Sequence, residues 1–272
     1  MSWKLAFSTL ACPDWSLERA IDEARRWGYE GLELRLIDGQ LIEPDLSSAD
    51  RESIGRLLRE SGLGLVAADS SIRLVTDRLD VEVETELVSF LELAAGWSAP
   101  LVRVFGGNPP DGISNEDVVA KAARILEQTA LVAERLGVKI GLETHDAFSA
   151  ASAVARVLDR VRSPEVGVVW DVLHTHRMGE TPQQVWDLVG PRILSVHVKD
   201  ARQAPDGEGW QLVLLGEGEV PVRDCLDVLR RGGYEGWLVA EWEKRWHPEI
   251  EDPDVALPHE IAVLRDWLAD DC

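Results

Sequence analysis

Short apolar segments alternate with longer amphipathic segments along the whole chain. Most of the apolar segments lack a regular polar alternation, which is typical of strands buried on both faces of a parallel sheet. We therefore predict eight strands, at 3–10, 31–37, 63–69, 101–107, 138–144, 166–171, 193–200 and 237–243.

The segments between these strands carry apolar residues at helical spacing. Ser16 is placed to cap a helix that Gly28 ends, and Asn115 is placed to cap another that Gly137 ends. Serine and asparagine accept hydrogen bonds from the first backbone amides of a helix, and glycine adopts the left-handed turn that follows its last residue. The remaining predicted helices are one that follows Ser47 and Ser48 and ends near Gly62, and those at 80–97, 149–161, 181–189, 221–231 and 254–269.

Eight strands that alternate with eight helices predict a (β/α)8 TIM barrel that forms one domain over residues 1–272. The alternative is a doubly wound open sheet, which usually carries a glycine-rich phosphate turn after its first strand. The corresponding turn here, TLACPDWS, contains no GxG. The stretch from Ala201 to Val220 is predicted to be a functional loop after the seventh strand.

Composition and charge narrow the classes of partner. The chain has 272 residues, of which 45% are hydrophobic and 28% charged, with a net charge of −21. This charge disfavours nucleic acid and anionic membrane surfaces. No apolar run is long enough to span a bilayer, and the first residues lack the basic segment of a signal peptide. With only Cys12, Cys225 and Cys272, we expect a reduced, cytoplasmic protein.

Four consecutive predicted strands end in side chains that can bind a metal ion. They are Glu143 in GLETHD, Asp171 in VVWDVLH, His197 in SVHVKD and Glu241 in LVAEWE. The carboxyl ends of barrel strands surround the active site, although any one such residue can also cap the next helix. Three carboxylates and one imidazole favour a hard divalent ion. Such an ion lowers the barrier to removing a proton next to a carbonyl that it polarises.

The motifs GLETHD, WDVLHTH, VHVKDAR, LGEGEV and GYEGWLVAEWE, within 138–245, resemble the xylose isomerase-like TIM-barrel superfamily. The similarity is to its sugar phosphate isomerase/epimerase-type members. The resemblance implies that Glu143, Asp171, His197 and Glu241 hold the metal and that His174 contacts the substrate. Mn²⁺ is the expected ion, with Mg²⁺, Co²⁺ and Zn²⁺ as alternatives. Glu143 and Glu241 are then also the expected proton acceptor and donor.

Two positions bear on the choice of reaction. Ketose 3-epimerases of this superfamily carry a second Glu where this chain has Ser149, which argues against that substrate class. The HVKD segment, with Lys199, is similar to inosose dehydratases. We expect Lys199 to act on the substrate, with a pKa lowered by a nearby cation and by burial. The alternative is that Lys199 forms a salt bridge with Asp200 or another carboxylate.

Further side chains are candidates for the substrate pocket. Arg103 is predicted either to bind the substrate or to pair with Glu143, and His145 is a predicted substrate contact. Trp242 is a candidate wall of the pocket. Glu33 and Arg35 are predicted to form an inward-facing ion pair that supports the site.

We therefore predict a divalent-metal-dependent isomerase or epimerase that acts on a sugar, a sugar acid or an inositol-derived ketone. The alternative is a carbon–oxygen lyase of the inosose dehydratase type. An apurinic endonuclease is disfavoured, because all six histidines lie between His145 and His259 and none is on the first four strands. A barrel that binds a sugar without converting it is a further alternative. The expected partner is a small carbohydrate or polyol, and association into a homo-oligomer is left open.

Overall fold

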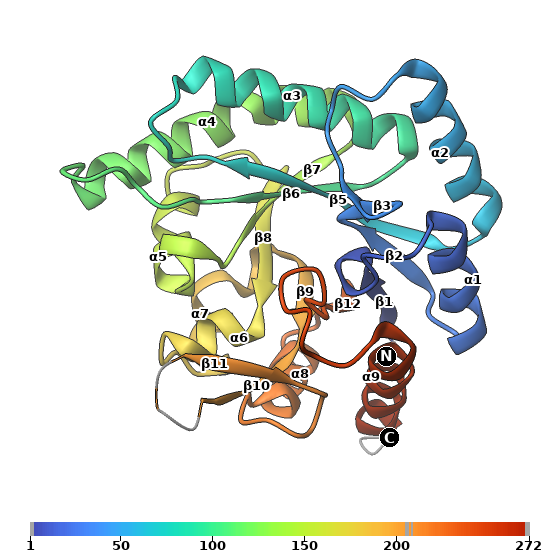
Figure 1. Ribbon diagram of the computed structural model, residues 1–272. Helices are drawn as coiled ribbons and strands as arrows, with labels where there is room; N and C mark the ends of the chain where they lie inside the picture. Colours follow the sequence, from blue (N-terminus) through green and yellow to red (C-terminus); the bar gives the residue numbers. More distant parts are fainter. Residues whose placement is uncertain (1–2, 205–206, 208, 270–272) are drawn as a thin grey trace.

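Eight parallel strands in the described part of the chain close into a barrel, and each strand pairs with its neighbours in chain order. The structure is a computed structural model that describes residues 3–204, 207 and 209–269. Figure 1 shows the barrel with its covering helices. The barrel strands are β1 (Lys4–Ser8), β2 (Gly31–Leu34), β5 (Gly64–Arg73), β6 (Leu101–Phe105), β7 (Lys139–Glu143), β8 (Val166–Asp171), β9 (Ile193–Val198) and β12 (Trp237–Ala240). The predicted fold is therefore confirmed, and each predicted apolar segment overlaps one barrel strand, although β5 extends beyond its segment to Arg73.

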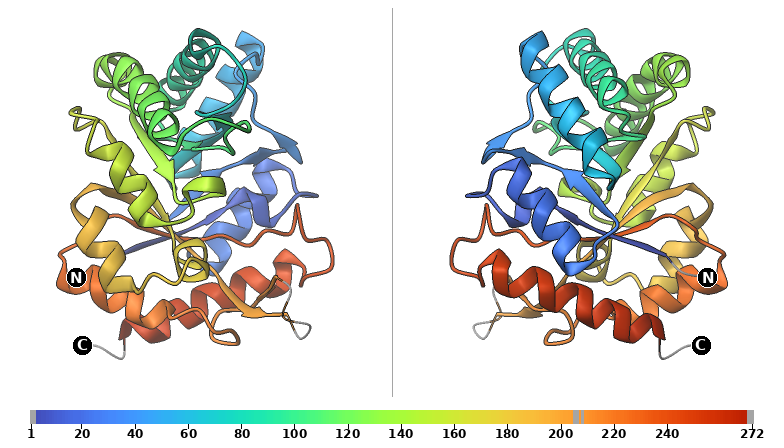
Figure 2. Two further views of the ribbon diagram at one scale, coloured as in Figure 1. Left: turned by 90° about the vertical axis from the view of Figure 1, so that its left-hand side faces the viewer. Right: turned by 90° about the vertical axis from the view of Figure 1, so that its right-hand side faces the viewer.

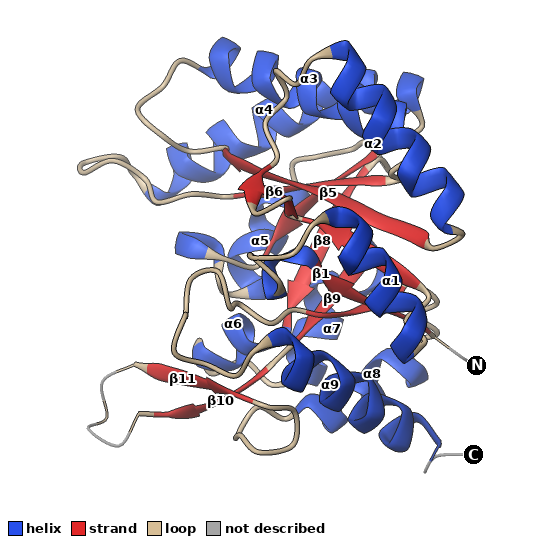
Figure 3. Cartoon of the chain, turned by 45° about the vertical axis from the view of Figure 1, so that its right-hand side comes forward, coloured by secondary structure: helices blue, strands red, loops and turns tan. Residues whose placement is uncertain are grey.

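Helices pack around the outside of the barrel, as Figures 2 and 3 show. The described α-helices are α1 (Leu17–Trp27), α2 (Ser48–Ser61), α3 (Asp80–Trp97), α4 (Asn115–Leu136), α5 (Ala151–Leu158), α6 (Val172–Arg177), α7 (Pro182–Val189), α8 (Val222–Arg231) and α9 (Pro253–Ala269). Three 3₁₀ helices accompany them: η1 (Thr9–Ala11), η2 (Asp146–Phe148) and η3 (Gly190–Arg192).

Capping residues define both ends of α1 as predicted. The Ser16 hydroxyl accepts a hydrogen bond from the Arg19 amide at 3.2 Å, and Gly28 ends α1 with φ +83°. The prediction that Asn115 caps α4 is wrong by one residue, because the Ser114 hydroxyl accepts from the Asp117 amide. A serine hydroxyl and an asparagine amide are nearly equivalent caps, so residue type alone does not separate neighbouring candidates.

Two antiparallel hairpins were not predicted. One joins β3 (Leu36–Ile37) to β4 (Gln40–Leu41), and the other joins β10 (Asp200–Gln203) to β11 (Trp210–Val213). The second hairpin occupies much of the predicted loop from Ala201 to Val220 and projects away from the barrel (Figure 3). The strand predicted at 193–200 accordingly ends at Val198.

The side chain of Asp200 organises the turn that follows this hairpin. Its carboxylate accepts hydrogen bonds from the backbone amides of Ala201, Gly216, Gly218 and Val220. A Cβ atom at Gly218 would lie 2.1 Å from Asp200 Oδ1, so this position requires glycine. The glycines of LGEGEV therefore serve the geometry of this turn.

A small apolar cluster fills the barrel interior on the side away from the carboxyl ends of the strands. It consists of Ala6, Val66, Ala67, Leu101, Val169 and Val239, which come from five barrel strands. A separate, larger core lies largely between the strands and the surrounding helices. This packed interior supports the polar side chains at the carboxyl ends of the strands.

The described residues also relate to the predictions about cysteines and membrane-spanning segments. Cys12 and Cys225 are buried free thiols, and Cys272 lies outside the described residues. None of the described helices is long and apolar enough to cross a membrane.

Candidate metal centre

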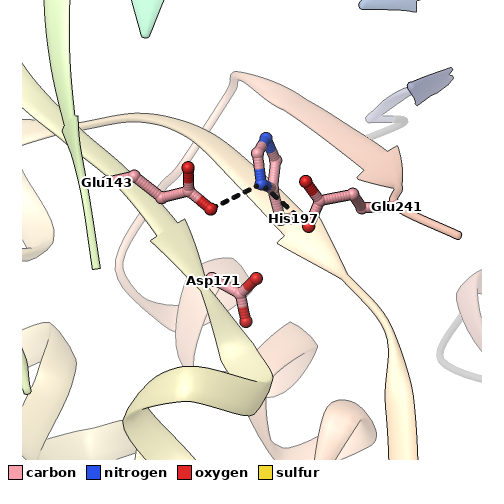
Figure 4. Close-up of side chains that lie close together, drawn as sticks. All are labelled: Glu143, Asp171, His197 and Glu241. Atoms are coloured by element: carbon pink, nitrogen blue, oxygen red, sulfur yellow. Dashed lines mark ion pairs between the residues drawn. The ribbon is translucent and has the colours of Figure 1, made fainter. Parts of the chain in front are cut away.

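The four predicted ligands meet at the carboxyl ends of their strands. Glu143 and Asp171 are the last residues of β7 and β8, His197 lies in β9, and Glu241 directly follows β12. Each of the four offers a ligand atom, and these atoms all lie within 4.8 Å of one another. Figure 4 shows the four side chains pointing toward one another. Parallel pairing explains the convergence, because Asp171 and His197 are register partners.

Several atoms of this cluster are buried and lie within ion-pair distance of a charged neighbour, but make no hydrogen bond of regular geometry in the described part of the chain. They are Oε2 of Glu143, Oδ2 of Asp171, Nδ1 of His197 and Oε2 of Glu241. His197 Nδ1 lies 3.4 Å from Glu143 Oε1 and 3.3 Å from Glu241 Oε2, close enough for ion pairing (Figure 4). Burying polar atoms without full hydrogen bonding is costly. The arrangement and the donor types therefore fit a divalent cation with oxygen and nitrogen ligands.

The other nitrogen of His197 faces Glu33. Nε2 lies 3.0 Å from Glu33 Oε1, and both side chains are fully buried. Burial opposes protonation of His197, but the carboxylates of Glu241 and Glu33 raise its pKa well above the usual range. A carboxylate on the outer nitrogen is the usual way in which a metal-binding histidine is oriented.

The predicted ion pair between Glu33 and Arg35 is wrong. Glu33 pairs with His197, whereas Arg35 donates from Nη1 to the carbonyl of Asp69 and to the hydroxyl of Ser71. Glu33 lies within β2, whereas Arg35 follows the last residue of this strand of four residues. They therefore contact different neighbours.

Lys199 lies among the carboxylates, so its predicted salt bridge with a neighbouring carboxylate is confirmed. Its Nζ atom is 2.8 Å from Asp171 Oδ2 and 2.5 Å from Glu241 Oε2, and it also pairs with Glu243. The predicted lowering of its pKa next to a bound cation stays a prediction, and the metal-free site shows the opposite direction. Burial alone would lower the pKa of Lys199, but the three carboxylates raise it well above its ordinary value. Asp200, the other predicted partner, is used by the backbone of the following turn.

Arg103 also forms ion pairs with carboxylates, so the predicted pairing with Glu143 is confirmed. Its Nε lies 3.1 Å from Glu143 Oε2, and its Nη2 lies 3.2 Å from Asp69 Oδ2. Burial raises the pKa of Glu143, yet Arg103 and His197 outweigh this and bring it to about 2. Arg103 therefore keeps Glu143 ionised and in place.

His174 and His145 lie side by side near the cluster. Their rings meet edge to face with centroids 4.6 Å apart. The His174 amide donates to Asp171 Oδ1 at 2.9 Å, and burial lowers the pKa of the His174 imidazole. The hydrogen bond with Asp146 raises the pKa of His145 against the effect of its burial. The predicted contacts of both histidines with a substrate stay predictions.

A cavity of about 370 Å³ opens onto this cluster. Trp246, rather than the predicted Trp242, lines it, because Trp242 is 2% exposed and its indole N–H donates to the carbonyl of Glu251. A larger cavity of about 460 Å³ lies at the opposite end of the strands, away from the cluster of the four candidate ligands. The lining residues of the smaller cavity are Leu10, Arg35, Arg73, Arg103, Phe105, Glu143, His145, Lys199, Glu241, Glu243 and Trp246.

Sequence reasoning missed Asp69 and Glu243, which pair with Arg103 and Lys199. Asp69 ends the apolar run LGLVAAD, so the rule that identified the metal ligands also identifies it. Glu243 follows Glu241 by two residues, and the sequence gives no signal that it reaches Lys199. The hydroxyl of Ser149 donates to the carbonyl of Asp146.

Comparison with known proteins places this geometry in context. The model of the family described as xylose isomerase-like TIM barrel matches residues 21–267. The inosose isomerase of Bacillus licheniformis is 28% identical over 138 residues, which cover 47% of this chain and 49% of that protein. The chain thus spans about half the length of this relative.

Two further relatives and one solved structure extend the comparison. The fructoselysine 3-epimerase of Escherichia coli O157:H7 is 22% identical over 83% of this chain and 85% of that protein. The inosose dehydratase of Bacillus thuringiensis is 25% identical over 60% of this chain and 56% of that protein. The crystal structure of the IOLI protein with a binding zinc atom has a TM-score of 0.84 at 19% identity, with 98% of both chains covered. This last similarity shows the shared fold.

Proposed function

The chain belongs to the xylose isomerase-like TIM-barrel family, and we propose that it is a divalent-metal-dependent isomerase or epimerase. Its substrate would be a sugar, a sugar acid or an inositol-derived ketone. The observation that carries this proposal is the buried cluster of Glu143, Asp171, His197 and Glu241, in which the two glutamates line one cavity. Relatives named as isomerases, epimerases and dehydratases support an enzymatic role.

The four residues would hold one divalent ion. Three carboxylates and one imidazole favour Mn²⁺, and the zinc in the IOLI protein keeps Zn²⁺ among the candidates. When bound, the ion would supply Lewis acidity, which makes a hydrogen next to a substrate carbonyl more acidic. Because Nδ1 of His197 must be unprotonated to bind, loading the ion would release any proton carried there.

The chain's own residues would move the proton. Glu143 and Glu241 come from β7 and β12 and lie on either side of His197 (Figure 4). One would accept the proton from the carbon next to the carbonyl, and the other would return a proton to a carbon of the resulting enediolate. Return to the opposite face of the same carbon gives an epimer, and return to the neighbouring carbon gives an aldose–ketose isomer.

The second candidate is a dehydratase, for which the position of Lys199 is the specific observation. Its ammonium group lies against Asp171 and Glu241 and lines the cavity. From there it can donate a proton to a β-hydroxyl group, which leaves as water after the α-proton has been removed. The inosose dehydratase relative supports this alternative.

The deciding experiment begins with elemental analysis of the purified chain. The loaded protein is then incubated in D₂O with a panel of keto sugars and with a 2-keto-inositol. A product with the molecular formula of the substrate, apart from solvent deuterium at one carbon, supports the isomerase or epimerase. An enone absorbance in the ultraviolet supports the dehydratase. A chain that takes up no metal would contradict both.

A further inference from the structure

Arg35 stands out among the cationic side chains that line the cavity. It follows β2, and its side chain and backbone together are 5% exposed. Nη1 donates to the carbonyl of Asp69 at 3.3 Å and to the hydroxyl of Ser71 at 3.0 Å. Within the described part of the chain, Nε and Nη2 have no hydrogen-bond partner, and no carboxylate lies within ion-pair distance. Since Arg35 lines the cavity, its remaining exposure is toward that cavity.

The other buried cations of the cavity are already paired. Arg103 contacts Asp69 and Glu143, and Lys199 contacts three carboxylates. Arg73, which also lines the cavity, is half exposed and only reaches Asp146 at 3.7 Å. A buried guanidinium without a counter-ion is costly, because its desolvation is not repaid by an ion pair. Arg35 therefore has both the charge and the free donors to receive an anion.

The backbone around Arg35 holds it in this position. The amides of Arg35 and Leu36 both donate to the hydroxyl of Thr9, at 2.9 Å and 2.8 Å. Burial and the nearby Arg103 lower the pKa of Arg35 to about 10, so the guanidinium stays charged at neutral pH. A fixed, charged guanidinium matches the geometry of carboxylate and phosphate oxygens.

We propose that Arg35 binds an anionic group of the substrate, a carboxylate or a phosphate, while the carbonyl end of the same molecule reaches the metal centre. The inference rests on the proposed function and deepens it, since it names an acidic sugar derivative as the substrate class. Arg35, Glu143 and Glu241 line one cavity of about 370 Å³, which is a volume typical of small-molecule sites.

The test uses three ketoses that differ only at the sixth carbon: D-fructose, D-fructose 6-phosphate and D-fructuronate. Their affinities are measured by calorimetry on the native chain, on Arg35→Met and on Arg162→Met. Arg162 is 92% exposed and serves as the matched control for the loss of one positive charge. Each protein is titrated both metal-free and metal-loaded, and its metal content and thermal stability are recorded.

The native chain should bind at least one charged ketose about tenfold or more tightly than fructose, as charge-assisted hydrogen bonds predict. Arg35→Met should lose this preference and keep its metal, and Arg162→Met should keep both. Tighter binding of the phosphate or of the carboxylate identifies the group. Equal affinities across the series, no binding of any charged member, or a preference that survives in Arg35→Met overturns the anion site. Metal uptake together with deuterium exchange into fructose would then leave the proposed function standing.

Discussion

Nε2 of His197 lies 3.0 Å from Oε1 of Glu33, although the two residues are 164 positions apart in the chain. They come from β9 and β2 and meet inside the barrel, where both side chains are fully buried. The contact leaves Nδ1 of His197 facing Glu143 and Glu241. Glu33 therefore fixes which nitrogen of the imidazole is presented to the proposed ion.

Glu33→Gln should weaken metal affinity by roughly 10- to 100-fold, because an amide oxygen is a poorer acceptor for the His197 N–H than a carboxylate. Competition with a chelator of known affinity measures this. In the metal-free variant the pKa of His197 should fall, because the substitution removes one of the carboxylates that stabilise the protonated imidazole. Unchanged affinity would show that Glu33 does not orient His197.

His197→Ala should lower metal occupancy and leave the barrel folded. The substitution removes the nitrogen ligand and retains the three carboxylates, which bind the ion less well alone. Elemental analysis after dialysis measures the occupancy, and far-ultraviolet circular dichroism measures the fold. Ser195→Ala is the matched control, because Ser195 is buried on the same strand two residues earlier. Full occupancy in His197→Ala would remove His197 from the ligand set.

The strands and the cluster of four candidate ligands could be predicted from the sequence because both depend on local patterns. An apolar run marks a strand buried on both faces, and the residue that ends it lies at the mouth of the barrel. The pairing of Glu33 with His197 depends on the closure of β2 and β9 around one interior, which no local pattern encodes. The hairpins β3–β4 and β10–β11 escaped prediction because their strands have two to four residues and carry no sustained apolar run.

The pKa of Lys199 is a second property that the sequence alone could not predict. Burial and a nearby cation were expected to lower it, and burial does act in that direction. In the metal-free site three carboxylates raise it instead, and one of them, Glu243, gave no signal in the sequence. The sign of a pKa shift depends on the full set of neighbours, so it could be determined only from the structure.

His174→Ala and Lys199→Met should each lower kcat/KM by about 10²-fold if these residues exchange protons with the substrate. Both variants should keep their metal at saturation. Lys199→Met should bind it no more weakly than the native chain, because the ammonium competes with the ion for Asp171 and Glu241. His176→Ala on the same helix and Lys139→Met at the far end of β7 are the matched controls. Unchanged turnover in both variants would assign the proton transfers to the glutamates alone.

Glu260 should make the stability of the chain depend on pH. This residue of α9 is 3% exposed, and burial raises its pKa to about 8, with smaller contributions from the charges of Asp200 and Glu217. The hydrogen bond from the Leu215 amide acts in the opposite direction. The folded chain therefore holds a proton here that the unfolded chain releases near the ordinary glutamate pKa of 4.5.

Because the folded-state pKa is the higher one, the contribution of Glu260 to stability is fully present below pH 4.5 and is lost as the pH rises through 8. Glu260→Gln carries no charge at any of these pH values and can still accept from the Leu215 amide. Relative to the native chain it should gain stability from pH 5 to pH 9, by about 1.4 kcal/mol for each unit of the pKa difference. Urea unfolding at both pH values measures this, with the exposed Glu134→Gln as the control. Parallel stability curves for the native chain and Glu260→Gln would show that Glu260 titrates normally.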